Sequence, residues 1–330
     1  MKIAFFSVHS YDKEYFNRYN DEHQLVFFEA SLNEQTTNLA SGNDAVCVFV
    51  NDKLNATVIT QLAQQGVKLI ALRCAGYNNV DLAAAKANNI KVVRVPAYSP
   101  HAVAEHAVAL MMTLNRKTHK AYNRVREGDF SLRKLTGFDL YGKTVGVIGT
   151  GKIGEAFSKI MIGFGCKVLA YDIFPDENLK QSGIEYTSLD NLLKSSDVVS
   201  LHCPLTEQTR HIINENSLSV MKKGAMLINT SRGALIDTKA AIEHLKSGQL
   251  GYLGIDVYEQ EEKLFFNNLT GEVIQDDVIM RLMSFPNVLI TAHQGFFTDE
   301  ALTQIAQTTL KNIHDFEKGL PLVNEVKQTA

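Results

Sequence analysis

Apolar runs and amphipathic stretches alternate over most of this chain. Short runs rich in β-branched and aromatic residues predict buried parallel strands, and apolar positions recurring every three or four residues predict helices. Before residue 100 the predicted strands are Lys2–Ser7, Gln24–Glu29, Ala45–Val50, Leu69–Cys74 and Lys91–Val95, and the predicted helices are Leu54–Gln65 and Asp81–Asn88. Such alternation is typical of a parallel sheet with helices on both faces.

A stiff segment from Val95 to Pro100 interrupts this pattern and predicts a crossing between domains. A helix is expected from Ala102 to Leu114. Its apolar side would pack between domains or between subunits.

The alternation resumes at residue 143. Predicted strands are Thr144–Ile148, Lys167–Tyr171, Val198–His202, Met226–Thr230, Leu253–Val257 and Val288–Ala292, and predicted helices are Lys152–Phe164, Ser188–Lys194, Asn214–Met221 and Asp237–Ser247. An extended loop is expected from Lys263 to Ser284. A last helix, Asp299 to about Lys318, lies beyond the final strand and should pack back on the N-terminal domain. The fold class is therefore α/β with two open parallel-sheet, Rossmann-like domains, residues 1–100 with 295–330 and residues 101–294.

The strand at Thr144 runs into a glycine-rich turn, G-T-G-K-I-G from Gly149 to Gly154, and then a helix. Gly149 permits the tight turn, Gly151 lets a pyrophosphate approach the helix N-terminus, and Gly154 allows close packing of helix and strand. The next strand ends at Asp172, near the distance expected for an acid that binds ribose hydroxyls. An acid there repels a 2′-phosphate, so the cofactor is expected to be NAD rather than NADP.

Three chemically useful side chains follow later strands of the same predicted sheet: Arg232, Glu261 and His293. Arg232 could pair with a surface acid, but its planar guanidinium also suits a carboxylate. His293 could be structural and Glu261 a solvated charge. If the two side chains lie together, the carboxylate of Glu261 favours the protonated imidazolium of His293, which can then donate a proton.

These parts fit the reduction of a 2-oxo acid. Arg232 would anchor the carboxylate, His293 would exchange the proton and Glu261 would keep the histidine charged. The backbone N–H groups of Ala75 and Gly76, after the fourth strand, could also hold an anion, although a plain turn explains them equally well. The reaction needs no metal, and no cluster of residues has metal-ligand spacing.

The amino-acid composition limits the classes of binding partner that are expected. With 45% hydrophobic residues, 21% charged residues and a net charge of −3, nucleic acid and anionic membranes are poor candidates. No apolar run is long enough to span a membrane. The four cysteines are scattered in apolar runs, as expected for reduced core thiols in a cytoplasmic protein.

At these motifs the chain resembles the D-isomer-specific 2-hydroxyacid dehydrogenases over essentially its whole length, and within them the fermentative NAD-dependent D-lactate branch. The resemblance is carried by six segments: residues 73–81, 96–99, 147–154, 229–233, 256–261 and 293–296. It implies that the NAD-binding domain is inserted in a flavodoxin-like substrate domain and that the protein is a homo-oligomer. It also implies catalytic roles for Arg232, Glu261 and His293, and contact of Tyr98 with the substrate.

Further NAD contacts are implied by the same resemblance. They fall on Lys152, Ile153, Asp172, Cys203, Pro204, Thr209, Thr230, Ser231, Arg232 and Asp256.

Phe296, Phe297 and the loop from Lys263 distinguish this chain from relatives that act on glycerate, phosphoglycerate or formate. Phe296 is expected to wall the substrate site and favour pyruvate. Two alternatives stay open: a D-2-hydroxyacid dehydrogenase for longer or aromatic substrates, and a non-enzymatic NADH-sensing protein on the same fold.

Overall fold

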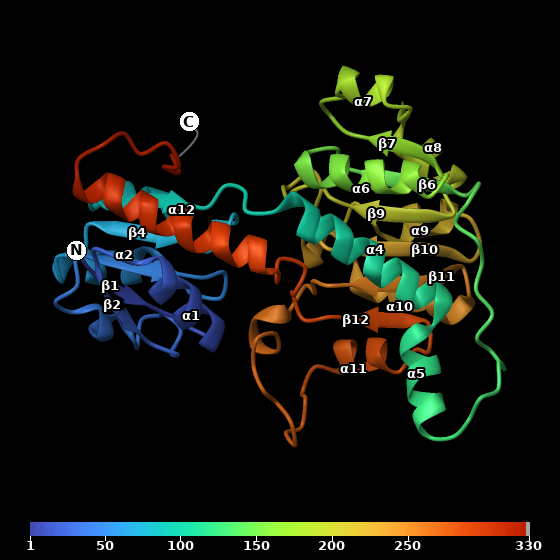
Figure 1. Ribbon diagram of the computed structural model, residues 1–330, viewed down its shortest axis with the longest axis horizontal. Coiled ribbons are helices and arrows are strands. Elements are labelled where there is room, and N and C mark those ends of the chain that lie inside the picture. Colours follow the sequence, from blue (N-terminus) through green and yellow to red (C-terminus); the bar gives the residue numbers. More distant parts are fainter. Residues whose placement is uncertain (328–330) are drawn as a thin grey trace. The chain divides into compact units, whose positions relative to one another are not determined.

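The protein is described from residue 1 to residue 327 in a computed structural model, and it forms two compact units. Unit 1 comprises Met1–Ser99 and the segment from Phe297 onward, and unit 2 is Pro100–Phe296. Each unit is an α/β layer structure around its own parallel sheet (Figure 1). The predicted fold class is confirmed.

The sheet of unit 1 has five parallel strands in the order β2-β1-β3-β4-β5. Their bounds are β1 Lys2–Phe5, β2 Gln24–Phe27, β3 Ala45–Val48, β4 Leu69–Leu72 and β5 Lys91–Arg94. This is the flavodoxin-like order, whose direction reverses between β1 and β3. All five strands were predicted, each one or two residues longer than observed. After α12 the chain returns to this sheet, where Glu325 pairs with Val93 in an antiparallel bridge.

Helices cover both faces of the unit 1 sheet. They are α1 Ser10–Tyr19, η1 Thr37–Ala40, α2 Ala56–Gln64, α3 Leu82–Ala87 and α12 Asp299–Glu317. The last helix packs on α1, β4 and β5, as its apolar stripe predicts (red in Figure 1). Helix α1 was not predicted because, among its ten residues, the buried ones are Asp12 and Phe16, which is too little apolar surface to set a period.

The sheet of unit 2 has seven parallel strands in the order β12-β11-β10-β9-β6-β7-β8. Their bounds are β6 Thr144–Ile148, β7 Lys167–Tyr171, β8 Glu185–Tyr186, β9 Val198–Leu201, β10 Ala225–Asn229, β11 Leu250–Ile255 and β12 Val288–Ile290. The strand order reverses between β6 and β9, and open α/β sheets bind ligands at that switch point.

Helices also flank this second sheet. They are α4 Pro100–Arg116, α5 Thr118–Arg126, α6 Lys152–Gly163, α7 Glu177–Gln181, α8 Leu189–Ser195, α9 Glu215–Val220, η2 Gly233–Leu235, α10 Thr238–Ser247, η3 Glu261–Lys263 and α11 Asp277–Met283. The apolar side of α4 packs on α6, β10 and β11 of its own unit (Figure 1). The expectation that this stripe packs between domains or subunits is therefore wrong.

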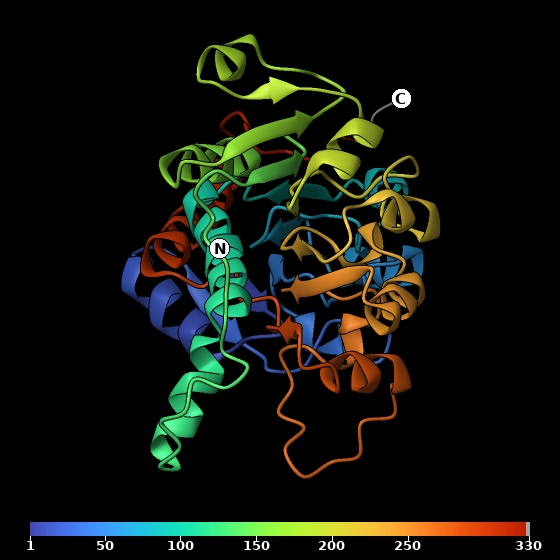
Figure 2. The same ribbon diagram turned by 90° about the vertical axis from the view of Figure 1, so that its right-hand side faces the viewer.

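The segment after Lys263 also differs from prediction, because α11 lies inside the expected loop. Asp276 caps α11 by accepting hydrogen bonds from Val278 N and Ile279 N, at 2.9 and 3.1 Å. Helix α5 projects from unit 2 and contains no buried residue (Figure 2). Across the described residues, no helix is long and apolar enough to cross a membrane.

Candidate active site

The glycine-rich turn lies at the switch point of the unit 2 sheet. Gly149 has φ +94°, and a Cβ there would stand 2.4 Å from Cys203 N, at the end of β9. A Cβ on Gly154 would stand 1.9 Å from Gly149 O. Neither position has room for a side chain, so these glycines bring the first turn of α6 against the strand ends.

Gly151 differs from the other two glycines of the turn, because a Cβ there meets no described atom within 4 Å. It is the N-cap of α6 and offers no side chain to the first N–H groups of that helix, which begins at Lys152 and Ile153. Open space in front of an uncapped N-terminus fits a phosphate group. The turn therefore has the shape that the pyrophosphate of NAD requires.

Asp172 follows β7 and is positioned by this turn. Its Oδ2 accepts hydrogen bonds from Thr150 N at 2.6 Å and Thr150 Oγ1 at 3.1 Å, and its Oδ1 accepts one from Phe174 N at 2.9 Å. The residue is partly exposed. A carboxylate has about four lone-pair positions, so Asp172, which accepts three hydrogen bonds here, retains about one position for a ribose hydroxyl.

The loops after β9 and β10 meet beside the glycine turn. Ser231 Oγ donates to Cys203 O at 2.7 Å, and Thr209 Oγ1 donates to Pro204 O at 2.7 Å. Burial raises the pKa of the Cys203 thiol to about 11, so this thiol stays protonated and serves packing. All four cysteines are buried free thiols, as the sequence predicts.

Arg232 stands on a turn that is fixed from both sides. Asn229, fully buried, donates to Arg232 O at 2.9 Å and accepts from Ser231 N at 3.0 Å. A Cβ on Gly233 would lie 2.1 Å from the carbonyl carbon of Tyr258. The Arg232 turn therefore packs directly on the turn that leads to Glu261.

Glu261 and His293 are joined by a hydrogen bond. Glu261 Oε1 lies 2.8 Å from His293 Nδ1, while its Oε2 accepts from Tyr258 N at 2.8 Å. His293 has φ +52°, an uncommon conformation for a residue with a side chain. Because Nδ1 is engaged with the carboxylate, Nε2 is the ring atom left for other chemistry.

Asp256 holds the backbone around His293. Its carboxylate accepts hydrogen bonds from Gln294 N at 2.9 Å and Gly295 N at 2.7 Å, and its own carbonyl accepts from His293 N at 2.8 Å. Burial alone would raise the pKa of Asp256, but hydrogen bonds from His106 and Thr291 outweigh it and hold the pKa below its usual value.

Sequence reasoning missed His106. Its Nε2 lies 2.9 Å from Thr291 Oγ1 and 3.3 Å from Asp256 Oδ1. It stands on α4, far from β12 along the chain, and no local pattern reveals that contact. The resemblance placed Asp256 among the NAD contacts, whereas the hydrogen bonds observed here anchor the loop that carries His293.

The remaining expected substrate residues fall at other places in the chain. Ala75 and Gly76 follow the carboxyl end of β4 in unit 1, and Arg94 Nη1 donates to Ala75 O at 2.8 Å. Tyr98 lies just before the chain enters unit 2. Phe296 is the last residue of unit 2 and is buried.

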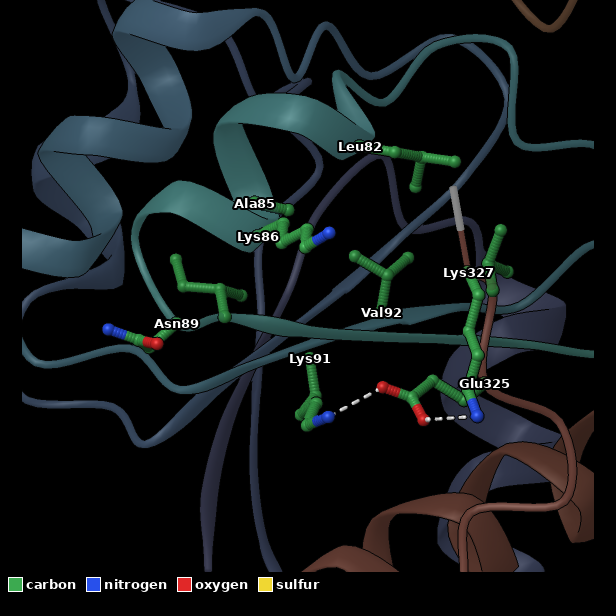
Figure 3. Close-up of a pocket in the computed structure, with 10 residues that line it drawn as sticks. Leu82, Ala85, Lys86, Asn89, Lys91, Val92, Glu325 and Lys327 are labelled. Carbon is green, nitrogen blue, oxygen red and sulfur yellow. Dashed lines mark hydrogen bonds and ion pairs between the residues drawn. The ribbon is translucent and has the colours of Figure 1, made fainter. Parts of the chain in front are cut away.

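A separate cavity of about 430 Å³ opens in unit 1 beside α3 and β5 (Figure 3). It is lined by Leu82, Val92 and the ion pair between Lys91 and Glu325, whose Nζ and Oε1 are 2.7 Å apart. None of the expected site residues lines it.

A dinucleotide turn with an acid after β7, followed on the same sheet by an arginine turn and a histidine–carboxylate pair, is typical of NAD-dependent oxidoreductases. Residues 108–295 match the family described as "D-isomer specific 2-hydroxyacid dehydrogenase, NAD binding domain". The chain belongs to the D-isomer-specific 2-hydroxyacid dehydrogenase family. It is an enzyme of that family, and its cofactor is NAD.

Individual relatives agree with this assignment. The chain is 57% identical to 2-hydroxyacid dehydrogenase A of Aspergillus oryzae, over 96% of this chain and 92% of the relative. It is 54% identical to D-lactate dehydrogenase of Escherichia coli, over 99% of this chain and 100% of the relative. The apo structure of the Escherichia coli enzyme superposes with a TM-score of 0.91 at 52% identity, covering 99% and 100% of the two chains.

Proposed function

We propose that this protein is an NAD-dependent D-lactate dehydrogenase that reduces pyruvate reversibly to D-lactate. The observation that carries the proposal is the 2.8 Å hydrogen bond between His293 and Glu261, on a loop fixed by Asp256. The similarity to the Escherichia coli D-lactate dehydrogenase supports the choice of substrate.

NADH, when bound, supplies the hydride that reaches the carbonyl carbon. The protein supplies the proton. With Nδ1 held by Glu261, a protonated His293 presents Nε2–H to the carbonyl oxygen and takes the proton back in the oxidation of lactate. The negative charge of Glu261 stabilises the imidazolium before the proton is given.

Arg232 is proposed to bind the substrate carboxylate. Its Nη1 donates to Ser231 O at 2.7 Å, which leaves further N–H groups of the guanidinium for a ligand. A carboxylate in such a fork has a defined orientation, so the carbonyl carbon is held in one position. The backbone of Ala75 and Gly76, with Tyr98, is proposed to contribute from unit 1, the substrate domain.

The NAD site is proposed to be the switch point of the unit 2 sheet. Gly149, Gly151 and Gly154 with Lys152 and Ile153 would bind the pyrophosphate, and Asp172 the ribose. The strand-end loops complete the proposed site with Cys203, Pro204, Thr209, Thr230 and Ser231.

A second candidate is a D-2-hydroxyacid dehydrogenase of broader specificity. The 57% identical relative from Aspergillus oryzae carries the general name, which favours this alternative. The family assignment makes the protein an enzyme, so the NADH-sensing alternative is set aside.

Assembly and location follow from surface and redox features. A homo-oligomer is supported by exposed apolar side chains on α5 and the segment after it: Tyr122, Val125, Phe130 and Leu132. A cytoplasmic location is supported by the free thiols and by the reaction, which uses a soluble cofactor.

NADH oxidation should be compared for pyruvate, 2-oxobutyrate, phenylpyruvate and hydroxypyruvate, with chiral analysis of the product. A highest kcat/KM for pyruvate with D-lactate as product supports the proposal, and a highest value for phenylpyruvate favours the second candidate. His293→Asn should abolish turnover. The matched control is His211→Asn, because His211 Nε2 makes a similar 2.7 Å contact with Glu259 in the same unit. Equal activities of the two variants would refute the role of His293.

A further inference from the structure

Two segments distant in sequence bring a histidine and two carboxylates together in unit 1. Glu22 and His23 precede β2, and Glu317 is the last residue of α12. One ligand atom from each of the three side chains lies within 4.8 Å of the other two. Because Glu317 comes from the far end of the chain, no spacing in the sequence reveals this cluster.

His23 is buried in an unusual state. Its side chain is 4% exposed, and its Nδ1 is sealed from solvent with no hydrogen-bond partner among the described residues. Glu317 Oε2 is 3.7 Å from this nitrogen, which is too far for a hydrogen bond. Buried ring nitrogens are normally paired, so an unpaired one that faces a carboxylate is placed to act as a ligand atom.

Both carboxylates are already oriented by a second partner. Glu317 Oε1 accepts from the Met1 ammonium group at 2.6 Å, and Glu22 Oε2 lies 2.9 Å from His314 Nδ1. Glu317 Oε2 remains for the cluster, 3.7 Å from His23 Nδ1. Metal ligands in proteins are commonly held in this way by outer hydrogen bonds.

We propose that Glu22, His23 and Glu317 bind a divalent transition-metal ion of the zinc type. One imidazole and two carboxylates form a usual ligand set for such ions. In a tetrahedral zinc site with bonds of about 2.0–2.1 Å, ligand atoms are about 3.4 Å apart. The 3.7 Å between His23 Nδ1 and Glu317 Oε2 is close to that separation.

The surroundings also suit a cation. A cavity of about 300 Å³ adjoins the cluster and is lined by Glu22, His23 and His314, which leaves space for a water as a fourth ligand. Lys311 lines the same cavity, but its charge is neutralised by Asp315 at 2.9 Å.

The site would tie the end of α12 to the segment before β2. Since it contains none of the residues proposed for catalysis, its effect would be on stability rather than on the reaction. An ion that binds the folded chain alone raises the apparent stability in proportion to the logarithm of its concentration.

The experiment is a calorimetric titration of the metal-stripped enzyme with Zn²⁺, together with thermal unfolding measured at increasing Zn²⁺ concentrations. Wild type should bind about one ion in this site and gain thermal stability. His23→Asn removes a ligand, so it should weaken that binding by at least about 10- to 100-fold, the loss caused by removing an outer hydrogen-bond partner of a metal ligand. The double variant Glu22→Gln with Glu317→Gln, which leaves the buried ring intact, should do the same.

Glu14→Gln is the matched control, because Glu14 is an exposed carboxylate of the same unit that pairs with Arg18 at 2.7 Å. It should bind Zn²⁺ like wild type. Zinc at His293 would instead inhibit turnover, and that inhibition should persist in both cluster variants. Zinc binding and zinc-dependent stability that are unchanged in both cluster variants would overturn the proposal, as would no uptake by wild type at micromolar zinc.

Discussion

His293 and Glu261 share a hydrogen bond of 2.8 Å although His293 adopts a left-handed backbone conformation with φ +52°. Such a conformation costs about 1–3 kcal/mol for a residue with a side chain and persists where surrounding contacts determine it. Here the determining contacts are made by Asp256, which binds Gln294 N and Gly295 N. The position of the proposed proton donor is therefore set by a buried carboxylate that need not touch the substrate.

Glu261→Gln should leave the hydrogen bond in place but remove the charge. The imidazolium that donates the proton then lacks its negative partner, so kcat/KM for pyruvate should fall. The measurement is kcat/KM for pyruvate across pH. Glu259→Gln, which removes a charge from the neighbouring pair with His211, should leave the profile unchanged. Superimposable profiles for Glu261→Gln and wild type would exclude this role.

Arg232→Lys should lose activity although the charge is kept. Lysine is a point charge and cannot make the two parallel hydrogen bonds of a guanidinium. Loss of a hydrogen bond to a charged group costs about 1.5–3 kcal/mol, which predicts a fall in kcat/KM for pyruvate of about 10- to 150-fold. Arg18→Lys serves as the control on an exposed pair. A variant within twofold of wild type would contradict carboxylate binding by Arg232.

Asp172→Ala should weaken the binding of NAD and strengthen the binding of NADP relative to wild type. The substitution removes both the acceptor for the ribose hydroxyls and the repulsion of a 2′-phosphate. Losing charged hydrogen bonds predicts a rise in the Kd for NAD of roughly tenfold or more. The same change frees Thr150 N, so thermal stability should be measured in parallel. An unaltered ratio of NAD to NADP affinity would show that Asp172 does not bind the ribose hydroxyls.

The unit 2 strands that the sequence predicted best are β6 and β7, whose observed bounds, Thr144–Ile148 and Lys167–Tyr171, equal the predicted ones. Each is a continuous apolar run ended by a glycine or an acid, so the residues alone mark both ends. Their register follows from the parallel sheet, which buries both faces and penalises any slip.

The sequence did not predict the short helices α7 and α11. Helix α7 has five residues, of which Leu179 is buried, and α11 lies inside the segment that was expected to be a loop, so neither was marked by an apolar period. Their capping residues, Asp176 and Asp276, were the available signal, since each accepts a hydrogen bond from the first turn. Helix α11 also packs against α10 and β12, and the local sequence does not reveal those contacts.

The same limit applies to the site. Strand ends of one sheet meet at one edge, so the neighbourhood of Arg232, Glu261 and His293 could be predicted from topology. The support given by His106 could not, because it depends on how α4 packs across β11 and β12.

His202 should make the enzyme less stable in acid. Its Nδ1 is sealed from solvent without a partner in the described chain, and burial lowers the pKa of the ring to about 3. Between that value and about 6.5, the unfolded chain binds a proton that the folded chain does not, so stability falls as pH decreases. The upper limit of this loss is about 1.4 kcal/mol per pH unit. Unfolding of wild type and His202→Gln should be compared at pH 7 and pH 5. A stability difference that does not change with pH would refute the assignment.

Phe296 should set the preference for short substrates. It follows His293 by three residues and is 7% exposed, whereas its neighbour Phe297 is 50% exposed and contacts Tyr11 with ring centroids 4.9 Å apart. A phenyl ring beside the substrate carbonyl leaves room for a methyl group and crowds longer side chains. Overpacking of this kind costs about 1–3 kcal/mol, or roughly fivefold to 150-fold in kcat/KM.

Phe296→Ala should therefore shift preference from pyruvate toward phenylpyruvate, measured as the ratio of the two kcat/KM values. The burial of Phe296 admits a second role as a packing element, and the two roles predict different results. A selector ring changes the ratio, whereas loss of a packing ring lowers stability and slows both substrates equally. Phe297→Ala provides the comparison, since its more exposed ring packs on Tyr11 in unit 1. If Phe297→Ala shifts the ratio and Phe296→Ala does not, the selecting ring is Phe297.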